Sequence, residues 1–271
     1  MKHLLKRKIR RLAKKLVLYA IRLQLFFVLK LEKSDTVSGF HKIFSKLNNS
    51  KIINYLLLIC EHRHQLSNEE YLLLEIVKRM NKMGYFYTPE PVFYGDASII
   101  EKVKNCQSLV ITTIHNGFAF TIKFVNSLNR KVATIAADSD YVKDKVFNRT
   151  GINSKVKVIF RDKFCLANLT GAVRDKHIIC CDIDYQKSKR EKFLYISPAL
   201  FIFAKKSNLP VLFARYEISN TGKLEIKLKE SNNQKEAEEI TIDFIDFVNS
   251  GSALQSENLC RQMIQRPVLR D

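Results

Sequence analysis

The sequence predicts an α/β fold in which a mixed, mostly parallel sheet is flanked by helices. After residue 105, short β-branched runs alternate with stretches of helical periodicity, which is typical of parallel strands joined by crossover helices. The last two runs are separated by the turn "SNTG", which predicts an antiparallel hairpin at one side of the sheet. A chain of 271 residues, 46% of them hydrophobic, is long enough to bury such a core.

The first part of the chain has a different character, which divides it into residues 1–33 and residues 34–271. Leu5, Ile9, Leu12 and Leu16 fall on one helical face, with Lys and Arg between them. This pattern predicts an amphipathic helix that lies in a membrane interface. The alternative is a core helix with a solvated basic end.

Residues 16–31 are strongly apolar, but they do not predict a membrane-spanning helix. Arg22 and Gln24 interrupt a run that is shorter than the roughly 20 apolar residues that a span needs. The polar stretch 31–39 then ends the helix. An interfacial position therefore fits this run better than a transmembrane one.

Two helices and a connector are predicted before the alternating region. The helices cover residues 40–61 and 68–83, the second with Ser67 or Asn68 as its N-cap, and residues 84–96 form an aromatic connector with two prolines. The predicted strands are 108–114, 131–137, 155–160, 177–183, 210–218 and 222–230. The predicted helices between and after them are 117–128, 141–149, 163–174, 197–207 and 234–249.

The charge of the chain predicts an anionic partner. Lys and Arg number 46 against 27 Asp and Glu, giving a net charge of +19. The clustering of basic residues at the N-terminus favours an anionic membrane surface, and we expect no nucleic-acid partner because no nucleic-acid-binding motif is present. The six cysteines show no zinc-ligand spacing, so reduced thiols and no metal site are expected.

Polar residues follow several predicted strands at the point where each strand ends. His115 follows the first strand, Asp138 and Asp140 the second, Arg161 the third. Asp182 and Asp184 close the fourth. Because active groups gather at the carboxyl ends of parallel strands, these residues form a candidate site. Each also has a purely structural interpretation as a turn former, helix cap or surface ion pair.

The order of these features resembles the bacterial lipid A late acyltransferases and their lysophospholipid-acyltransferase relatives over roughly residues 105–230. "LVITTIHNGF" is similar to the family's strand that ends in a histidine opening a helix. "FRDKFCLANLTGAVRDKHIICCDIDYQ" is similar to its arginine-plus-acid segment and Asp-x-Asp-aromatic motif. "SPALFIFAKKSNLPVLFARYEISNTGKLEIKLKE" is similar to its later helix, strand and closing hairpin.

The resemblance implies an enzyme that transfers an acyl chain from an acyl thioester, on acyl carrier protein or coenzyme A, to a hydroxyl of a membrane lipid or glycolipid. His115 would be the general base, and Asp182 and Asp184 would match the acidic motif. Asn116, Gly117, Arg161, Asp138 and Asp140 would contribute to substrate binding, with Arg161 holding an acceptor phosphate. No metal or redox cofactor is implied, and the expected location is the cytoplasmic face of the bacterial inner membrane.

The chain departs from the family pattern beside the histidine. The family motif is His-x4-Asp/Glu, and Phe120 occupies the acidic position here. Two hypotheses follow. In the first, a neighbouring strand-end carboxylate supports His115 in an active acyltransferase. In the second, the fold has become a catalytically inactive lipid-binding or accessory protein.

Overall fold

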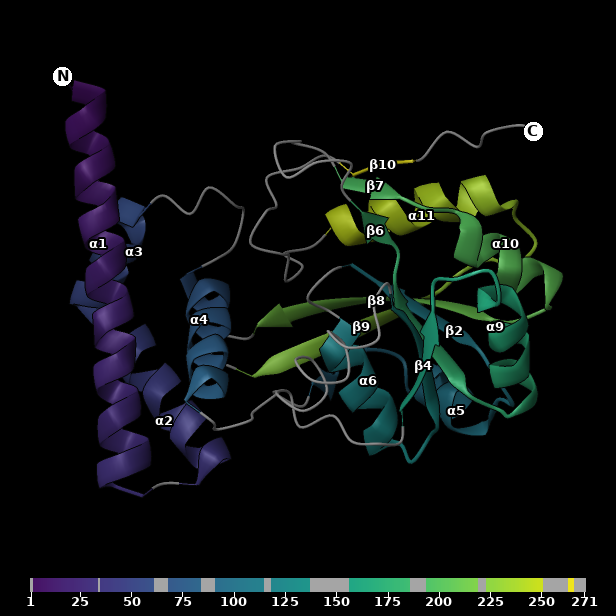
Figure 1. Cartoon of the computed structure of the whole chain (residues 1–271), viewed down its shortest axis with the longest axis horizontal. Helices are drawn as coiled ribbons and strands as arrows, with labels where there is room; N and C mark the ends of the chain where they lie inside the picture. The colour runs from purple at the N-terminus through teal and green to yellow at the C-terminus, as the bar shows by residue number, and fades with distance from the viewer. Residues whose placement is uncertain are drawn as a thin grey trace. The chain divides into compact units, whose positions relative to one another are not determined.

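A computed structural model shows that the chain forms two compact units (Figure 1). One unit contains residues 1–88 and 218–223, and the other contains residues 89–217 and 224–271. The first helical segment ends at Leu31, close to the division predicted at residue 33, but the compact unit that contains it continues to Thr88. The structure describes residues 2–33, 35–60, 68–83, 91–114, 118–136, 156–185, 194–218, 223–250 and 263–265.

The first unit is helical. Its longest helix, α1 (Lys2–Leu25), continues directly into a π-helical segment, η1 (Phe26–Leu31). α1 packs against α3 and α2 packs against α4, so each of these helices buries apolar side chains against a neighbour. The remaining helices are α2 (Thr36–Asn48), α3 (Lys51–Cys60) and α4 (Asn68–Lys82). The core residues include Val17, Ile21, Leu25, Phe40, Ile43, Leu57, Leu72 and Ile76.

The predicted single helix over residues 40–61 is wrong, because the chain forms two helices there. α2 ends at Asn48, and α3 begins at Lys51. The Ser50 hydroxyl accepts a hydrogen bond from the Ile53 amide (3.4 Å), and the Asn54 amide group donates to the Asn48 carbonyl (2.8 Å). The side chains of Ser50 and Asn54 thus each satisfy a backbone group that a helix end leaves unpaired.

The turn between η1 and α2 depends on Asp35 and Gly39. The Asp35 carboxylate accepts hydrogen bonds from the Val37 and Ser38 amides, each 3.0 Å, and so caps α2. A Cβ on Gly39 would lie 2.4 Å from Leu29 Cδ2. The missing side chain therefore lets the start of α2 approach the buried Leu29 of η1.

The second unit is built on a seven-stranded sheet in the order β1-β9-β8-β2-β5-β3-β4. β2 is parallel to β8 and β5, β3 is parallel to β5 and β4, and β1 is parallel to β9. β8 and β9 are adjacent and joined by only residues 219–223, which is too short for the crossover that parallel strands need. The strands are β1 (Val92–Phe93), β2 (Val110–Thr113), β3 (Val132–Ala136), β4 (Val156–Phe160), β5 (Ile178–Asp182), β8 (Val211–Ile218) and β9 (Leu224–Glu230).

The sheet confirms the predicted α/β class with a mixed, mostly parallel sheet flanked by helices. On one face, Phe201, Phe213 and Phe244 pack together, with ring centroids 5.3–6.2 Å apart, beneath α10 and α11. On the other face, Tyr216 contacts α6 through Phe120. The helices are α5 (Ala97–Asn105), α6 (Phe118–Ser127), α9 (Cys165–Arg174), α10 (Ala199–Lys206) and α11 (Ala237–Asn249).

Several elements were not predicted. β1 and α5 lie within or just after the expected connector, although the Asp96 carboxylate caps α5 by accepting from the Ser98 amide at 2.8 Å. A second sheet has the order β10-β7-β6. Its strands are β6 (Asp184–Tyr185), β7 (Leu194–Ile196) and β10 (Met263–Gln265). The helix predicted over residues 141–149 and the cap proposed at Ser67 lie outside the described residues.

Within the described parts of the chain, no helix combines the length and the apolar content that crossing a bilayer requires.

Candidate active site

The candidate site lies at the carboxyl edge of the parallel strands. β2 is in register with β5, so that Thr113 is opposite Asp182, and the Ile183 amide donates to the Thr113 carbonyl at 3.3 Å. β5 and β4 flank β3, and the Arg161 amide donates to the Ala136 carbonyl at 3.0 Å. The ends of β2, β5, β3 and β4 therefore meet along one edge of the sheet.

Asp182 supplies negative charge at this edge. It is the last residue of β5 and is half-buried. Burial and then the Asp182 carboxylate raise the pKa of the neighbouring Cys181 thiol to about 12, whereas the positive charge of Arg161 lowers it. Asp182 and Arg161 thus both act electrostatically on the same thiol, which supports their placement at one edge.

A buried polar contact lies beneath the edge on the α6 side. Tyr216 of β8 is hydrogen-bonded to the Thr121 hydroxyl of α6, and both side chains are almost fully buried. Burial raises the pKa of Tyr216 well above its ordinary value, and the charge of Asp182 adds to this effect. The phenol is therefore neutral at physiological pH and available for hydrogen bonding.

The position that carries an acid in the resembled family is apolar in structure as well as in sequence. Phe120, in the first turn of α6, is 5% exposed, and its ring lies 5.5 Å from that of Tyr216. A carboxylate at this position would be buried against an aromatic ring and an uncharged hydroxyl pair. Any acid that supports His115 must therefore come from another element, and Asp182 is the described carboxylate at the end of the strand next to β2.

The predicted site residues divide into two groups. His115, Asn116, Gly117, Asp138 and Asp140 lie outside the described residues. Asp182 and Arg161 are brought to the same edge, with the Arg161 side chain exposed. Asp184 lies in β6, where it pairs with Ile196 of β7 and is 5% exposed. Asp184 is thus a buried strand residue of the small sheet.

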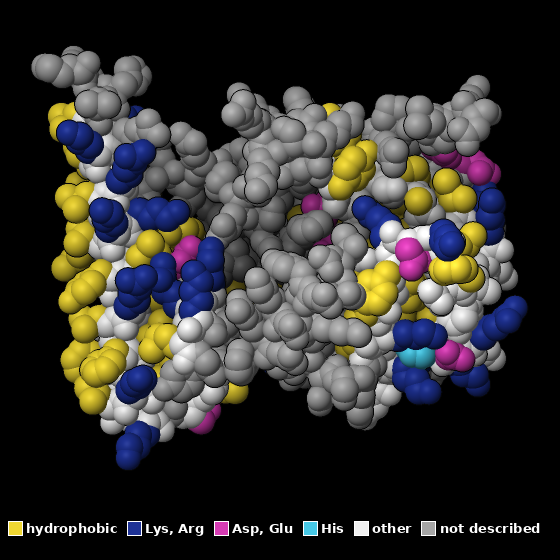
Figure 2. Space-filling view, viewed as in Figure 1, with side chains coloured by type: hydrophobic (Ala, Val, Ile, Leu, Met, Phe, Trp, Pro, Cys, Tyr) yellow, Lys and Arg dark blue, Asp and Glu magenta, His cyan; other side chains and the backbone are white. Residues whose placement is uncertain are grey.

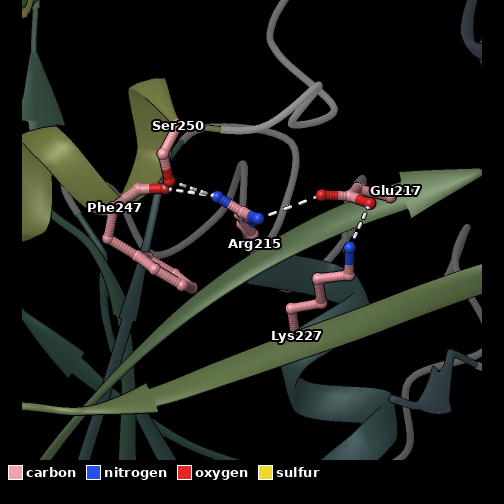
Figure 3. Close-up of polar contacts among 5 residues, drawn as sticks. All are labelled: Arg215, Glu217, Lys227, Phe247 and Ser250. Carbon is pink, nitrogen blue, oxygen red and sulfur yellow. Dashed lines mark hydrogen bonds and ion pairs between the residues drawn. The ribbon is translucent and has the colours of Figure 1, made fainter. Parts of the chain in front are cut away.

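A charged cluster that the sequence did not reveal anchors the end of β8 (Figure 3). Arg215 donates through Nη1 to the Phe247 carbonyl and to the Ser250 hydroxyl, both at 2.7 Å. Its Nε lies 3.3 Å from Glu217, which also pairs with Lys227 at 2.6 Å. The guanidinium also lies 4.8 Å from the centre of the Phe247 ring. Arg215 therefore joins β8 to the carboxyl end of α11, where a cation is favoured.

Two sequence signals could have identified the residues that were missed. In "FARYEI", Arg215 and Glu217 alternate with Tyr216. A period of two places Arg215 and Glu217 together on one face of the strand and Tyr216 on the other. Thr121 follows Phe120 in an otherwise apolar helix, which is a sign that its hydroxyl has a buried partner.

The cysteines lie in two kinds of place: Cys180 and Cys181 are buried in β5, whereas Cys106 at the end of α5 and Cys165 at the start of α9 are half-buried. The four whose side chains the structure describes, Cys106, Cys165, Cys180 and Cys181, are free thiols. Within the described part of the chain, no group of three or more His, Cys, Asp and Glu side chains is placed to hold a metal ion.

Comparison with known proteins adds no family assignment. No protein-family model matches the chain, and no curated protein matches its sequence.

Proposed function

We propose that the protein is an O-acyltransferase that moves a fatty acyl chain from an acyl thioester to a hydroxyl of a membrane lipid or glycolipid. The observation that carries the proposal is the in-register pairing of Thr113 with Asp182, because it places the end of the strand that precedes His115 beside a carboxylate. The resemblance of "LVITTIHNGF" to the family's histidine motif supports the same reaction.

The chemistry follows from an imidazole and a nearby carboxylate. His115 takes the proton of the acceptor hydroxyl as the oxygen attacks the thioester carbonyl, because an unassisted hydroxyl is a weak nucleophile at neutral pH. The tetrahedral intermediate then breaks its carbon–sulfur bond, and the imidazolium returns the proton to the leaving thiolate. Asp182 stabilises the imidazolium electrostatically in place of the family's usual acid.

Arg161 is proposed to hold an anionic group of the acceptor. Its side chain is exposed at the same edge as Asp182, and a guanidinium can bind a phosphate through two parallel hydrogen bonds. Asn116, Gly117, Asp138 and Asp140 complete the proposed substrate contacts on the basis of the resemblance. The acyl donor is acyl carrier protein or coenzyme A thioester, and the proposed location is the cytoplasmic face of the bacterial inner membrane.

The test is product formation by the purified full-length chain. The protein is incubated with acyl carrier protein and coenzyme A thioesters in separate reactions with a panel of membrane lipids, and mass spectrometry detects acylated lipids. The proposal expects a product whose mass equals that of the acceptor plus the fatty acid minus water. A lipid panel that yields no such product with either donor contradicts it.

A catalytically inactive lipid-binding or accessory protein is the second candidate function. The buried Phe120 favours it, because the position that carries the acid in the resembled family is apolar here and packs on Tyr216. This candidate predicts that a His115→Ala chain sustains the same cellular phenotype as the wild type. Loss of the phenotype in that variant favours the enzyme.

A further inference from the structure

The helix α1 carries two apolar rows on different faces. Residues of one row, such as Val17 and Ile21, are fully buried in the helical unit. The other row recurs every three or four residues along the same helix and is between 41% and 65% exposed. Figure 2 shows hydrophobic side chains along the length of α1. The exposed row consists of Leu5, Ile9, Leu12, Leu16, Tyr19 and Leu23.

The neighbouring helix α3 carries an exposed row of its own. Ile52, Tyr55 and Leu58 are 73%, 67% and 70% exposed, although α3 packs directly against α1 through its other side. Large apolar side chains that gather on two contacting helices form a patch of the kind that marks a binding surface. Single scattered residues would need no such explanation.

The charges beside these rows identify the partner. Residues 1–31 contain ten Lys and Arg and no Asp or Glu. Arg11, Lys15 and Arg22 are exposed on α1, and Figure 2 shows basic side chains beside the hydrophobic ones. A second copy of this face would bring like charges together, which opposes self-association. An anionic lipid surface complements both the apolar rows and the charge.

We propose that the exposed rows of α1 and α3 form one face that binds the surface of an anionic phospholipid bilayer. The exposed row runs along one side of α1 from Leu5 to Leu23, about 27 Å at 1.5 Å per residue. Because the apolar side chains occupy one side and basic side chains lie beside them, the helix lies along the interface rather than across it. The buried row keeps α1 folded onto the helical unit, and a whole folded unit therefore rests on the membrane. The inference is independent of the proposed acyl transfer.

The test measures binding of the full-length protein to vesicles of phosphatidylcholine with and without phosphatidylglycerol. Leu12→Gln/Leu16→Gln/Leu23→Gln replaces exposed side chains of α1 with a residue that favours helices, so the fold is kept. Ile52→Gln/Tyr55→Gln/Leu58→Gln does the same on α3. The matched control is Ile242→Gln, which changes an apolar side chain of α11 that is 49% exposed. Circular dichroism checks the helix content of each.

We expect each triple variant to bind anionic vesicles at least about tenfold more weakly than wild type, and the control to bind like wild type. Arg11→Gln/Lys15→Gln/Arg22→Gln is expected to lose about tenfold or more on anionic vesicles and little on phosphatidylcholine alone. If the α1 variant binds anionic vesicles as tightly as the wild type does, the proposal is overturned. If the α3 variant does so, α3 is not part of the binding face. If the wild type does not bind vesicles but self-associates, and the α1 variant does not self-associate, the face binds a second copy of the chain instead.

Discussion

Thr113, the last residue of β2, lies directly opposite Asp182, the last residue of β5, in the parallel sheet. His115 follows Thr113 by two residues in the sequence. The strand next to β2 therefore ends in a carboxylate. In the resembled family, the acid is instead in the helix that the histidine opens. The proposed mechanism depends on this substitution of one acid for another.

Asp182→Asn is predicted to slow acyl transfer by about tenfold or more while leaving the protein folded. The change removes the charge that supports the imidazolium but keeps the size of the side chain. Acylation rates at saturating donor measure it. The control is Asp175→Asn, which changes an exposed carboxylate paired with Lys157 after α9. Equal rates for Asp182→Asn and wild type would remove Asp182 from the mechanism.

Phe120→Glu is predicted to destabilise the fold rather than restore the family's acid. The new carboxylate would replace a ring that is 5% exposed and packed on Tyr216, and the expected cost in unfolding free energy is about 3 kcal/mol or more. Phe120→Leu, the control, should cost less because it keeps the position apolar. Urea unfolding measures both. A Phe120→Glu chain as stable as wild type and more active would show that the position accepts an acid.

Tyr216→Phe and Thr121→Val are predicted to be coupled, because their hydroxyls are hydrogen-bonded in a buried setting. Each single variant should lower the free energy of unfolding by about 1–2 kcal/mol, and the double variant should cost less than the sum of the two. The measurement is a double-mutant cycle by chemical denaturation. Additive costs would mean that the hydrogen bond contributes nothing specific.

Arg215→Ala is predicted to destabilise the junction of β8 with α11 by about 2–3 kcal/mol. Arg215→Lys should fail to restore it, since one ammonium cannot reproduce the guanidinium contacts with Phe247, Ser250 and Glu217. The exposed Arg174 of α9 gives the control, Arg174→Lys. Thermal unfolding compares the three variants with the wild type. An Arg215→Lys chain as stable as the wild type would show that only the positive charge of Arg215 matters.

The free energy of unfolding is predicted to fall as pH rises above about 9. Burial raises the pKa of Cys181 to about 12 from the ordinary 9.0, so between these values the unfolded chain releases a proton that the folded chain retains. The contribution is complete below pH 9 and is lost as pH rises toward 12. Urea unfolding at several alkaline pH values should show a shallower fall for Cys181→Ala. An identical slope in that variant would contradict the account.

The sequence predicted the parallel strands well because their signal is local. "VKVIF" and "HIICCDI" are short β-branched or apolar runs between turn residues, and both form strands within a residue or two of their predicted ends. The small sheet was missed because β6 and β7 are only two and three residues long. A two-residue strand is too short to show a sequence periodicity. Whether it forms depends on pairing with a segment elsewhere in the chain.

The candidate site was predicted only at the level of sheet edges. Asp182 and Arg161 could be assigned to one edge because Asp182 is the last residue of β5 and Arg161 directly follows β4. The burial of Asp184 in the small sheet could not be predicted, because the strand β6, which begins directly after Ile183, is only two residues long. The Thr121–Tyr216 contact joins residues 95 positions apart in the chain, and no local pattern encodes it.

Mass-spectrometric comparison of the wild-type and His115→Ala chains, with the same acyl thioester and the same lipid acceptor, tests the central claim most directly. The account predicts an acylated lipid from the wild type and a rate at least about a hundredfold lower from His115→Ala, since a positioned base contributes about 10²–10⁴-fold. Equal product from the two chains, or none from the wild type across the lipid panel, would contradict it.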